Sequence, residues 1–240
     1  ILCFGDATGA VDLTVSGGTP ATTGYVFDWN SAAFATEDLI DIPFGPYAVL
    51  VTDYLLCSDT LSVVLTQPDA PLDIDFTILD VYCFGDSTGN VLAEISGGTV
   101  PYTLSWELPI EDTTLFIDSL FTGDYVLNVI DFNNCVYQET ATVTQPDAPL
   151  TVTYDEVLPS CFEYSDGELT LVTAGGTAPY SYLWNTGDTT ISIDSLATGD
   201  FSAQIVDTLG CFTSIDIFLD EPPELQISID ADTLSGCSPF

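Results

Sequence analysis

The chain has 240 residues, with 37 Asp and Glu and no Lys, Arg, His or Met, so its formal net charge at pH 7 is −37. The lack of basic side chains excludes side-chain salt bridges, and the negative charge would repel a nucleic-acid backbone. A hydrophobic content of 46% argues against a disordered acidic tail. We expect no membrane insertion, because no apolar run is long enough to span a bilayer, and no enzyme, because only carboxylates and thiols remain as reactive groups.

The dominant feature of the chain is an internal repeat. Each unit has a cysteine, a Gly-Gly pair at a fixed spacing, one tryptophan and a closing Asp-x-x-x-Cys motif. The repeats are predicted at residues 1–70, 71–148 and 149–223, and residues 224–240 are interpreted as the start of a truncated fourth repeat. Such an array is typical of a rod or string of small domains. We also interpret the chain as an internal piece of a longer protein.

The predicted strands follow in chain order. Residues 11–16 alternate apolar and polar side chains, which predicts one half-buried strand in the first repeat. The second repeat has the same alternation in three segments, and the third has it before its tryptophan; the predicted inward-facing residues are Val91, Ala93, Ile95, Tyr102, Leu104, Trp106, Tyr125, Leu127, Val129, Tyr180, Tyr182 and Trp184. No segment has the pattern of an amphipathic helix.

Short proline-rich joints separate the repeats. Residues 67–71 and 145–149 have the same sequence, Gln-Pro-Asp-Ala-Pro, and Glu221-Pro222-Pro223 is a degenerate third copy. Two prolines in five residues predict a stiff, extended joint rather than a flexible linker. We therefore expect the repeats to form a semi-rigid rod.

The cysteines occur as one pair per repeat plus Cys237. This even distribution predicts disulfides formed in an oxidising compartment; free buried cysteines are the alternative, and zinc is excluded by the wide spacing and the lack of His. We expect one disulfide within each repeat, and Cys237 pairing outside this piece; the expected pairs are Cys3–Cys57, Cys83–Cys135 and Cys161–Cys211.

Several short strands, a central tryptophan and two distant cysteines per unit predict an all-β fold of tandem small immunoglobulin-like sandwiches. We expect each tryptophan to be buried against the disulfide; a ligand-binding surface tryptophan is the alternative. The spacing around Tyr47 and Tyr125 resembles a tyrosine corner, in which the phenol hydrogen-bonds a loop carbonyl, and Phe201 takes this position in the third repeat without a hydroxyl.

The motif series Cys-Phe-Gly-Asp-x-Thr-Gly, Gly-Gly-Thr, Pro-Tyr, Trp, Gly-Asp-Tyr and Asp-x-x-x-Cys resembles the SprB repeat. Residues 3–9 and 83–89 match its first motif closely, and residues 161–167 depart from it. SprB repeats occur in very large surface proteins of gliding Bacteroidetes. The resemblance implies secretion by the type IX pathway, display on the outer cell surface and an adhesive role, without a known binding site.

No cofactor is required by the sequence, but calcium is open, because no internal cation balances the carboxylates. The candidate ligands flank the joints: Asp73, Asp75, Asp80, Asp147, Asp155 and Glu156. Further candidates recur in the repeats: Asp6, Asp86, Asp53, Asp131 and Asp207. The last three precede the closing cysteines, where we favour the alternative that each carboxylate holds its own loop in an Asx turn.

O-glycosylation is a further hypothesis. Asp-Ser/Thr followed by a small apolar residue or Thr resembles the acceptor sequence of Bacteroidetes, and the alternative is that loops simply favour these residues. The candidate hydroxyls are Thr60, Ser87, Thr113, Ser119, Thr189, Ser195, Thr208 and Thr233.

Together these features predict a protease-resistant extracellular stalk or fibre, as the structural or adhesive segment of a large cell-surface protein. Its expected partners are neighbouring repeats and external surfaces or glycans. One alternative is a subunit of a self-assembling extracellular filament, in which copies of the chain contact each other through edge strands. The other is a carbohydrate-binding module that would use exposed aromatic residues such as Tyr25, Phe27 or Phe116.

Overall fold

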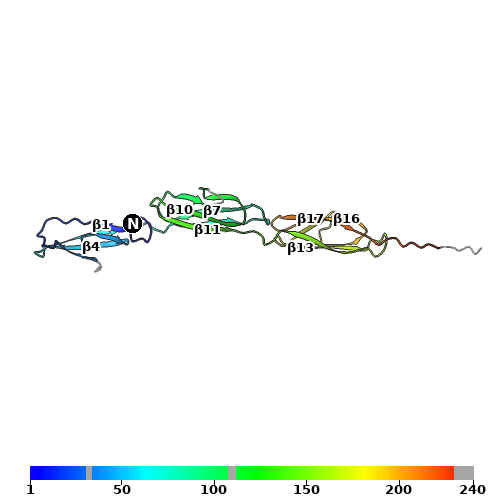
Figure 1. Ribbon diagram of the computed structural model, residues 1–240, viewed down its shortest axis with the longest axis horizontal. Coiled ribbons are helices and arrows are strands. Elements are labelled where there is room, and N and C mark those ends of the chain that lie inside the picture. The colour runs from blue at the N-terminus through cyan, green and yellow to red at the C-terminus, as the bar shows by residue number, and fades with distance from the viewer. Residues whose placement is uncertain (31–33, 108–111, 230–240) are drawn as a thin grey trace, which may run out of the picture. The chain divides into compact units, whose positions relative to one another are not determined.

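The computed structural model describes residues 1–30, 34–107 and 112–229, and all regular elements within them are β-strands (Figure 1). In this described part of the chain, no helix is long and apolar enough to cross a membrane. The chain divides into two compact units. Unit 1 contains residues 1–80 and 89–144, and unit 2 contains residues 81–88 and 145–240.

The first repeat forms two small antiparallel sheets. In one sheet β1 (Gly9–Val11) pairs with β3 (Leu39–Ile42). In the other, β4 (Gly45–Thr52) lies between β2 (Val26–Trp29) and β5 (Ser58–Leu65). The core between them contains side chains of both sheets, among them Leu39, Ile42, Trp29 and Val49.

The second repeat has the same two sheets and one additional strand. In the first sheet β7 (Gly89–Ser96) lies between β6 (Asp73–Leu79) and β9 (Phe116–Leu120). In the second sheet β10 (Gly123–Ile130) lies between β8 (Thr103–Trp106) and β11 (Val136–Val143). Apolar side chains alternate along β7 and β10, so one face of each sheet is buried.

The third repeat copies this arrangement in unit 2. Strand β13 (Gly167–Ala174) lies between β12 (Thr151–Val157) and β15 (Ser192–Leu196). Strand β16 (Gly199–Val206) lies between β14 (Ser181–Trp184) and β17 (Phe212–Leu219). Leu169, Leu171, Trp184 and Ile205 join the two sheets in one core. Each repeat is therefore a small immunoglobulin-like sandwich, as the sequence predicts, and no sheet among the described strands contains strands of two repeats.

The three tryptophans are core residues, which confirms the predicted burial and excludes the alternative of surface ligand binding. The expected packing against a disulfide of the same repeat is wrong, because both disulfides in the described part of the chain join cysteines of different repeats. Trp29, Trp106 and Trp184 are 2–3% exposed. Each indole Nε1–H donates a hydrogen bond at 2.9 Å to the carbonyl oxygen of a threonine, at Thr36, Thr114 and Thr190. The bond satisfies the polar atom of the indole inside the core.

The tyrosine corners are also confirmed. The Tyr47 hydroxyl donates to the Pro43 carbonyl at 2.8 Å, and the Tyr125 hydroxyl donates to the Phe121 carbonyl at 2.9 Å. Burial raises the pKa of Tyr125 above its ordinary value, because the charged phenolate is disfavoured away from water. Phe201 occupies the equivalent position in β16 and cannot make this bond.

The strand predicted at residues 11–16 is wrong beyond its first residue. Only Val11 belongs to β1, and residues 12–16 lie outside any strand. In the second repeat the equivalent β7 is long because it is paired on both sides, by β6 and by β9. Within its described residues, the first repeat has no equivalent of β6, so one edge of this segment lacks a partner strand.

Candidate functional site

The joints between repeats carry the strongest structural signal of function. In the first joint, residues 1–8, here called a cysteine loop, contact the second repeat. Cys3 forms a disulfide with Cys135, and the Asn133 side-chain amide donates to the Leu2 carbonyl at 3.0 Å. The joint residue Gln67 accepts a hydrogen bond from the Gly5 N–H at 2.9 Å. The first repeat is thus bonded to the second by a covalent link and by polar contacts.

The second joint repeats this geometry within unit 2. The cysteine loop 81–88 belongs by its contacts to the third repeat's unit, and Cys83 forms a disulfide with Cys211. The Gly85 N–H donates to the Gln145 side chain at 2.9 Å, as Gly5 does to Gln67. Two joints with the same contacts show that the repeat sequence encodes the joint and not only the sandwich.

The predicted disulfide pairing is therefore wrong. Cys3 pairs with Cys135 rather than Cys57, and Cys83 pairs with Cys211 rather than Cys135. The cause is the cysteine loop, which places its cysteine against the next sandwich, so the first cysteine of one repeat meets the second cysteine of the next. The predicted pair Cys161–Cys211 is excluded for the same reason, and Cys57 and Cys161 are free and exposed. Cys237 lies outside the described residues.

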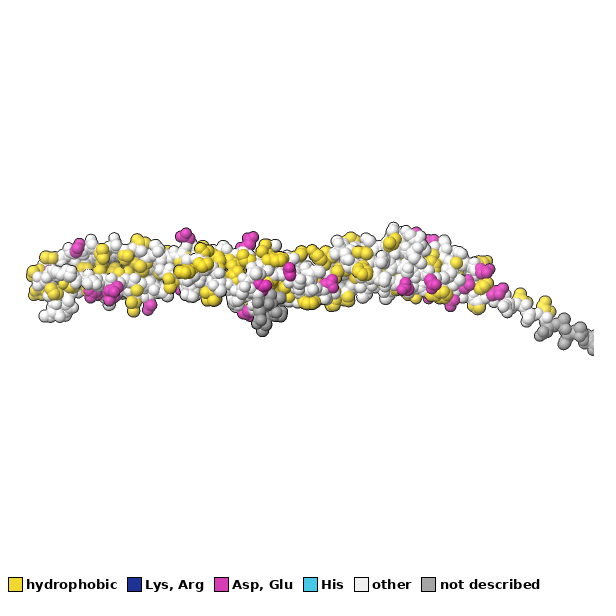
Figure 2. Space-filling view, turned by 90° about the horizontal axis from the view of Figure 1, so that it is seen from above, with side chains coloured by type: hydrophobic (Ala, Val, Ile, Leu, Met, Phe, Trp, Pro, Cys, Tyr) yellow, Lys and Arg dark blue, Asp and Glu magenta, His cyan; other side chains and the backbone are white. Residues whose placement is uncertain are grey.

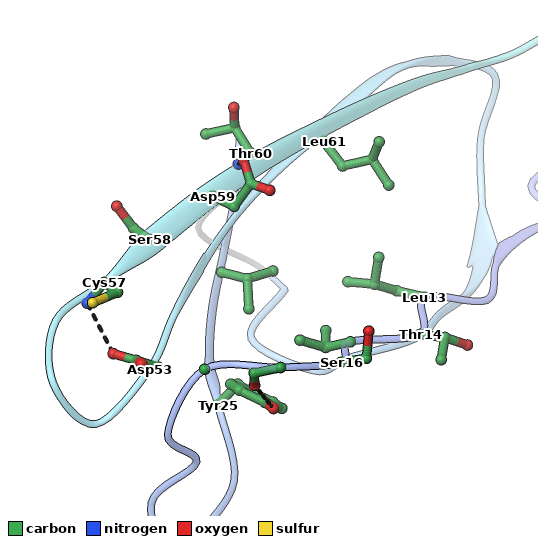
Figure 3. Close-up of a pocket in the computed structure, with 14 residues that line it drawn as sticks. Leu13, Thr14, Ser16, Tyr25, Asp53, Cys57, Ser58, Asp59, Thr60 and Leu61 are labelled. Atoms are coloured by element: carbon green, nitrogen blue, oxygen red, sulfur yellow. Dashed lines mark hydrogen bonds between the residues drawn. The ribbon is translucent and has the colours of Figure 1, made fainter.

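The aspartate of each Asp-x-x-x-Cys motif holds its own loop in place, as the Asx-turn interpretation predicts. Asp53, Asp131 and Asp207 are buried, and each carboxylate accepts backbone hydrogen bonds from the closing cysteine and from the threonine after the Gly-Gly pair. Figure 3 shows this bond between Asp53 and the Cys57 backbone. The backbone N–H groups of Thr19 and Cys57 hold the pKa of the Asp53 carboxyl below its ordinary value, because they stabilise the charged form.

The Gly-Gly pair is the contact surface for the joint. A Cβ at Gly97 would lie 1.7 Å from the Pro71 carbonyl oxygen, and one at Gly175 would lie 2.0 Å from the Pro149 carbonyl oxygen. The next glycines, Gly98 and Gly176, donate their N–H to the carbonyls of alanines in the joints, at Ala70 and Ala148. Glycine is required here because the joint backbone lies where a side chain would be.

The predicted calcium ligands at the joints are not brought together into a recognisable site. Asp80 accepts a hydrogen bond from the Thr144 N–H at 2.7 Å, and within the described residues no group of three carboxylate or thiol side chains is arranged to hold a metal ion. The candidate ligands that lie outside the Asp-x-x-x-Cys motifs, among them Asp73, Asp75, Asp147 and Asp155, therefore do not share one metal-binding geometry. Calcium binding stays a prediction, which a change in melting temperature on chelator addition would test.

The candidate glycosylation hydroxyls lie mostly on the surface. Ser87 is partly exposed and Thr233 lies outside the described residues; the exposed candidates are Thr60, Thr113, Ser119, Thr189, Ser195 and Thr208. The Ser119 and Ser195 hydroxyls donate to the preceding aspartates, and the Thr208 hydroxyl donates to the Pro179 carbonyl. Accessibility alone does not distinguish modification from turn formation, so O-glycosylation stays a prediction.

The aromatic residues considered for carbohydrate binding do not share one role. The Tyr25 hydroxyl donates to the Gly17 carbonyl at 2.6 Å, Phe27 packs against the core of the first repeat, and Phe116 in β9 is exposed. On the face shown in Figure 2, acidic side chains are scattered among apolar ones, without a single charged cluster. Glycan binding stays a prediction, and these three residues do not form one platform.

Two features of the joints escaped the sequence patterns. One is the disulfide register, and the other is the docking of the Ala-Pro carbonyls on the Gly-Gly pair. The common signal is positional: residues 72–79 and 150–157 precede the first cysteine of the second and third repeats, whereas Cys3 has only two residues before it. Aligning the repeats on the joint rather than on the cysteine would have placed β6 and β12 at the start of the second and third sandwiches.

Comparison with known families finds the SprB repeat in three segments, at residues 1–34, 76–107 and 159–189. The resemblance to the SprB repeat is therefore confirmed, once in each of the three repeats. The comparison with curated proteins found no match.

Comparison with solved structures finds remote similarity to chains of extracellular domains. The first eight Ig domains of Down Syndrome Cell Adhesion Molecule have 11% identity and a TM-score of 0.39, over 82% of this chain and 33% of that chain. Extracellular domains 3–5 of Drosophila OTK have 10% identity and a TM-score of 0.34, over 83% of this chain and 86% of that chain. Domains 4–9 of the surface layer protein SbsC have 12% identity and a TM-score of 0.21, over 90% of this chain and 46% of that chain. The chain thus spans about a third of the cell adhesion molecule chain that it resembles.

Proposed function

We propose that this chain is a load-bearing segment of a large extracellular surface protein, acting as a stalk or fibre that carries adhesive function away from the cell. The observation that carries the proposal is the pair of overlapping disulfides, Cys3–Cys135 and Cys83–Cys211, which link consecutive repeats. The SprB repeats and the tandem Ig-like sandwiches support the same function class. Disulfides persist in oxidising compartments, which supports an extracellular location.

The overlap of the two disulfides has a mechanical consequence. A covalent path from end to end crosses from Cys3 to Cys135, returns along the chain to Cys83 and crosses again to Cys211. Even when every sandwich is unfolded by force, most of the chain lies outside this path. The extension of the unfolded, oxidised chain is therefore limited to roughly a third of that of the reduced chain, at up to about 3.6 Å per residue. A stalk with such links stays short when its domains unfold under load.

The finer parts of the proposal follow from the repeat family and composition. We place the chain on the outer surface of a gliding bacterium, reached by type IX secretion, with neighbouring repeats and external surfaces as its partners. The absence of Lys and Arg leaves no trypsin site, which suits a fibre exposed to proteases.

Single-molecule force spectroscopy tests the load-bearing function. The full chain is held by its two ends and stretched to full unfolding, first oxidised and then in the presence of a thiol reductant. We expect the final extension to increase about threefold on reduction, as the length ratio requires. The Cys83→Ser variant should give an intermediate extension. An oxidised chain that extends as far as the reduced chain would contradict the proposed function.

A further inference from the structure

The third repeat carries a hollow of about 440 Å³ on the outer face of the sheet formed by β14, β16 and β17. Across β16 and β17, Asp200 lies directly opposite Phe218, and Ser202 lies directly opposite Asp216. Asn185 follows the end of β14, and its backbone N–H donates to the Ser202 carbonyl at 2.9 Å. The small Ser202 is thus surrounded by larger side chains and forms the floor of the hollow.

The two carboxylates of the hollow occupy diagonal positions. The Cβ atoms of diagonal neighbours on paired strands lie about 7 Å apart, so Asp200 and Asp216 border the same space. Phe218 adjoins both of them, because it lies opposite Asp200 and two residues after Asp216 on the same face of β17. Its side chain is 60% exposed. The hollow therefore combines two negative charges with an exposed aromatic ring.

The hollow presents hydrogen-bond acceptors without matching donors. The Asn185 side-chain N–H donates to the Asp200 backbone carbonyl at 3.2 Å, and among the described residues no donor reaches the carboxylate of Asp200 or of Asp216. The chain has no Lys, Arg or His that would pair with them. A ligand that satisfies both carboxylates has to bring N–H donors and a positive charge from outside the chain.

The equivalent carboxylate of the second repeat already has its partner. Asp124 has the position of Asp200, and it accepts a hydrogen bond at 2.7 Å from the Thr142 hydroxyl. Thr142 has the position of Phe218. The third repeat thus has an aromatic ring in place of the donor, which leaves its carboxylate available to a ligand.

Two further positions open the hollow in the third repeat. In the second repeat, Val126 has the position of Ser202 and Thr140 has the position of Asp216. The third repeat therefore combines a small floor residue, a second carboxylate and an aromatic ring where the second repeat has none of the three. The hollow is a property of this repeat and not of the fold.

The exposure of this outer face does not depend on the place of a repeat in the chain. In the first repeat, the equivalent residues Pro46, Ala48 and Ser62 are exposed and Val64 is 65% exposed. They are exposed although the second repeat follows within the same compact unit. The outer face of this sheet is therefore open to solvent beside a complete joint.

We propose that this hollow of the third repeat binds a guanidinium group, supplied by an arginine side chain of a partner protein. The planar group lies over Ser202, donates to the carboxylates of Asp200 and Asp216 from two of its edges and contacts the Phe218 ring. The formal net charge of −37 attracts a basic partner, whereas a second copy of this chain has no guanidinium group to offer. This inference goes beyond the proposed stalk function and does not depend on it.

A guanidinium group fits the hollow better than an ammonium group does. It is planar, more weakly hydrated and able to stack on an aromatic ring, whereas an ammonium group is a compact and strongly hydrated point charge. Its five N–H donors and lack of acceptors match a hollow whose polar groups are mainly acceptors, including the side-chain oxygens of Asn185 and Ser202.

The test uses the full-length, disulfide-bonded chain, isotope-labelled for NMR, with N-acetyl-arginine amide as the probe. Salt of about 0.15 M screens the general attraction between a cation and an acidic chain. We expect saturable shifts of the backbone amide signals at residues 185, 200–202 and 216–218, with a dissociation constant on the order of 1 mM for so small a ligand. Shifts spread evenly over the acidic residues of all three repeats would overturn the proposal.

Two further probes test the chemistry of recognition. N-acetyl-citrulline amide has a similar shape without the charge, and we expect it to bind about tenfold more weakly, because it loses the charge-assisted hydrogen bonds. N-acetyl-lysine amide keeps the charge without the planar fork and should also bind more weakly than the arginine probe. Equal affinity for the citrulline probe would reject recognition of the charge. Equal or tighter binding of the lysine probe would reject the guanidinium assignment.

Matched variants test the location of the site. Asp200→Asn removes one carboxylate of the hollow, and Asp124→Asn removes the same charge at the equivalent position of the second repeat. Phe218→Thr removes the ring and supplies a hydroxyl, as Thr142 does in the second repeat.

Phe212→Thr is the control for the ring, because Phe212 is a second exposed phenylalanine on the same face of β17. We expect Asp200→Asn and Phe218→Thr each to weaken binding of the arginine probe about tenfold, and the two controls to leave it unchanged. Substitutions of exposed residues change stability little, and the amide spectrum of each variant reports its fold. Equal affinities of the test and control variants would show that the hollow does not hold the probe.

Discussion

Cys3 and Cys135 are joined by a disulfide although they belong to different repeats and lie 132 residues apart. Cys83 and Cys211 repeat the same relation at a separation of 128 residues. The repeats are therefore not independently closed domains. The second and third sandwiches each share a disulfide with the cysteine loop of the preceding repeat.

Removing one of these links should destabilise the chain. We expect Cys3→Ser and Cys135→Ser each to lower the free energy of unfolding by about 2–5 kcal/mol, because a long closed loop no longer restricts the unfolded state. Cys57→Ser is the control, since it removes an exposed free thiol and should change stability by less than about 0.5 kcal/mol. Chemical denaturation of the monomeric protein measures all three. A loss of stability for Cys57→Ser as large as those for Cys3→Ser and Cys135→Ser would restore pairing within the repeat.

The contact between the Gly-Gly pair and the joint makes a second prediction. Gly97→Ala should destabilise the second repeat by about 1–3 kcal/mol more than Gly85→Ala, because only the first methyl group would collide with a backbone carbonyl. Both glycines have positive φ values, so the backbone strain is matched. Thermal unfolding with a probe in the second repeat gives the comparison. Equal losses for the two variants would mean that the joint does not pack on this surface.

The tyrosine corners predict opposite effects of one hydroxyl. Tyr125→Phe should lower stability by about 0.5–1.5 kcal/mol, because the Phe121 carbonyl loses its hydrogen bond. Phe201→Tyr should raise stability by a similar amount if the new hydroxyl bonds the Ala197 carbonyl, which has the position that Phe121 has in the second repeat. Tyr154→Phe at an exposed position is the control. A loss of stability in Phe201→Tyr would show that the third repeat has no room for the corner.

The carboxylate of Asp53 predicts a specific pH dependence. Its pKa is lower in the folded chain than the ordinary value of 3.8, so as the pH falls the unfolded chain takes up this proton first. The stabilisation by Asp53 is therefore complete above the ordinary value and is lost as the pH falls through the lowered one.

Asp53→Asn should consequently be less stable than the native chain near neutral pH, and the difference should shrink in acid below the ordinary carboxyl pKa. Asp28→Asn is the control for the removal of one negative charge from the surface. Urea denaturation across this pH range, reported as the difference between the variants, separates the loop effect from the general repulsion of the acidic chain. A difference that grows in acid would contradict the assigned hydrogen bonds.

Much of each sandwich could be predicted because its signals are local. The alternation around Val91 and Leu127 fixes which side chains face the core, and the spacing before Tyr125 fixes the corner. The tryptophan position is also local, since one apolar ring per repeat has to be buried and its N–H satisfied.

The disulfide register could not be predicted in the same way. In a tandem array, pairing Cys83 with Cys135 or with Cys211 satisfies the same count of cysteines per repeat, and sequence spacing alone does not choose between them. The choice depends on which sandwich the cysteine loop contacts, which is a tertiary property. The strand predicted at residues 11–16 failed for a related reason, because a strand edge forms only when its neighbour is present.

The most direct test of the account is disulfide mapping of the unreduced protein. Since the chain has no Lys or Arg, it is cleaved at Asp and Glu with free thiols blocked, and the linked peptides are identified by mass spectrometry. We predict peptides that link Cys3 to Cys135 and Cys83 to Cys211, with Cys57 and Cys161 recovered as blocked free thiols. Peptides that link Cys3 to Cys57 and Cys83 to Cys135 would contradict the joint on which the proposed function depends.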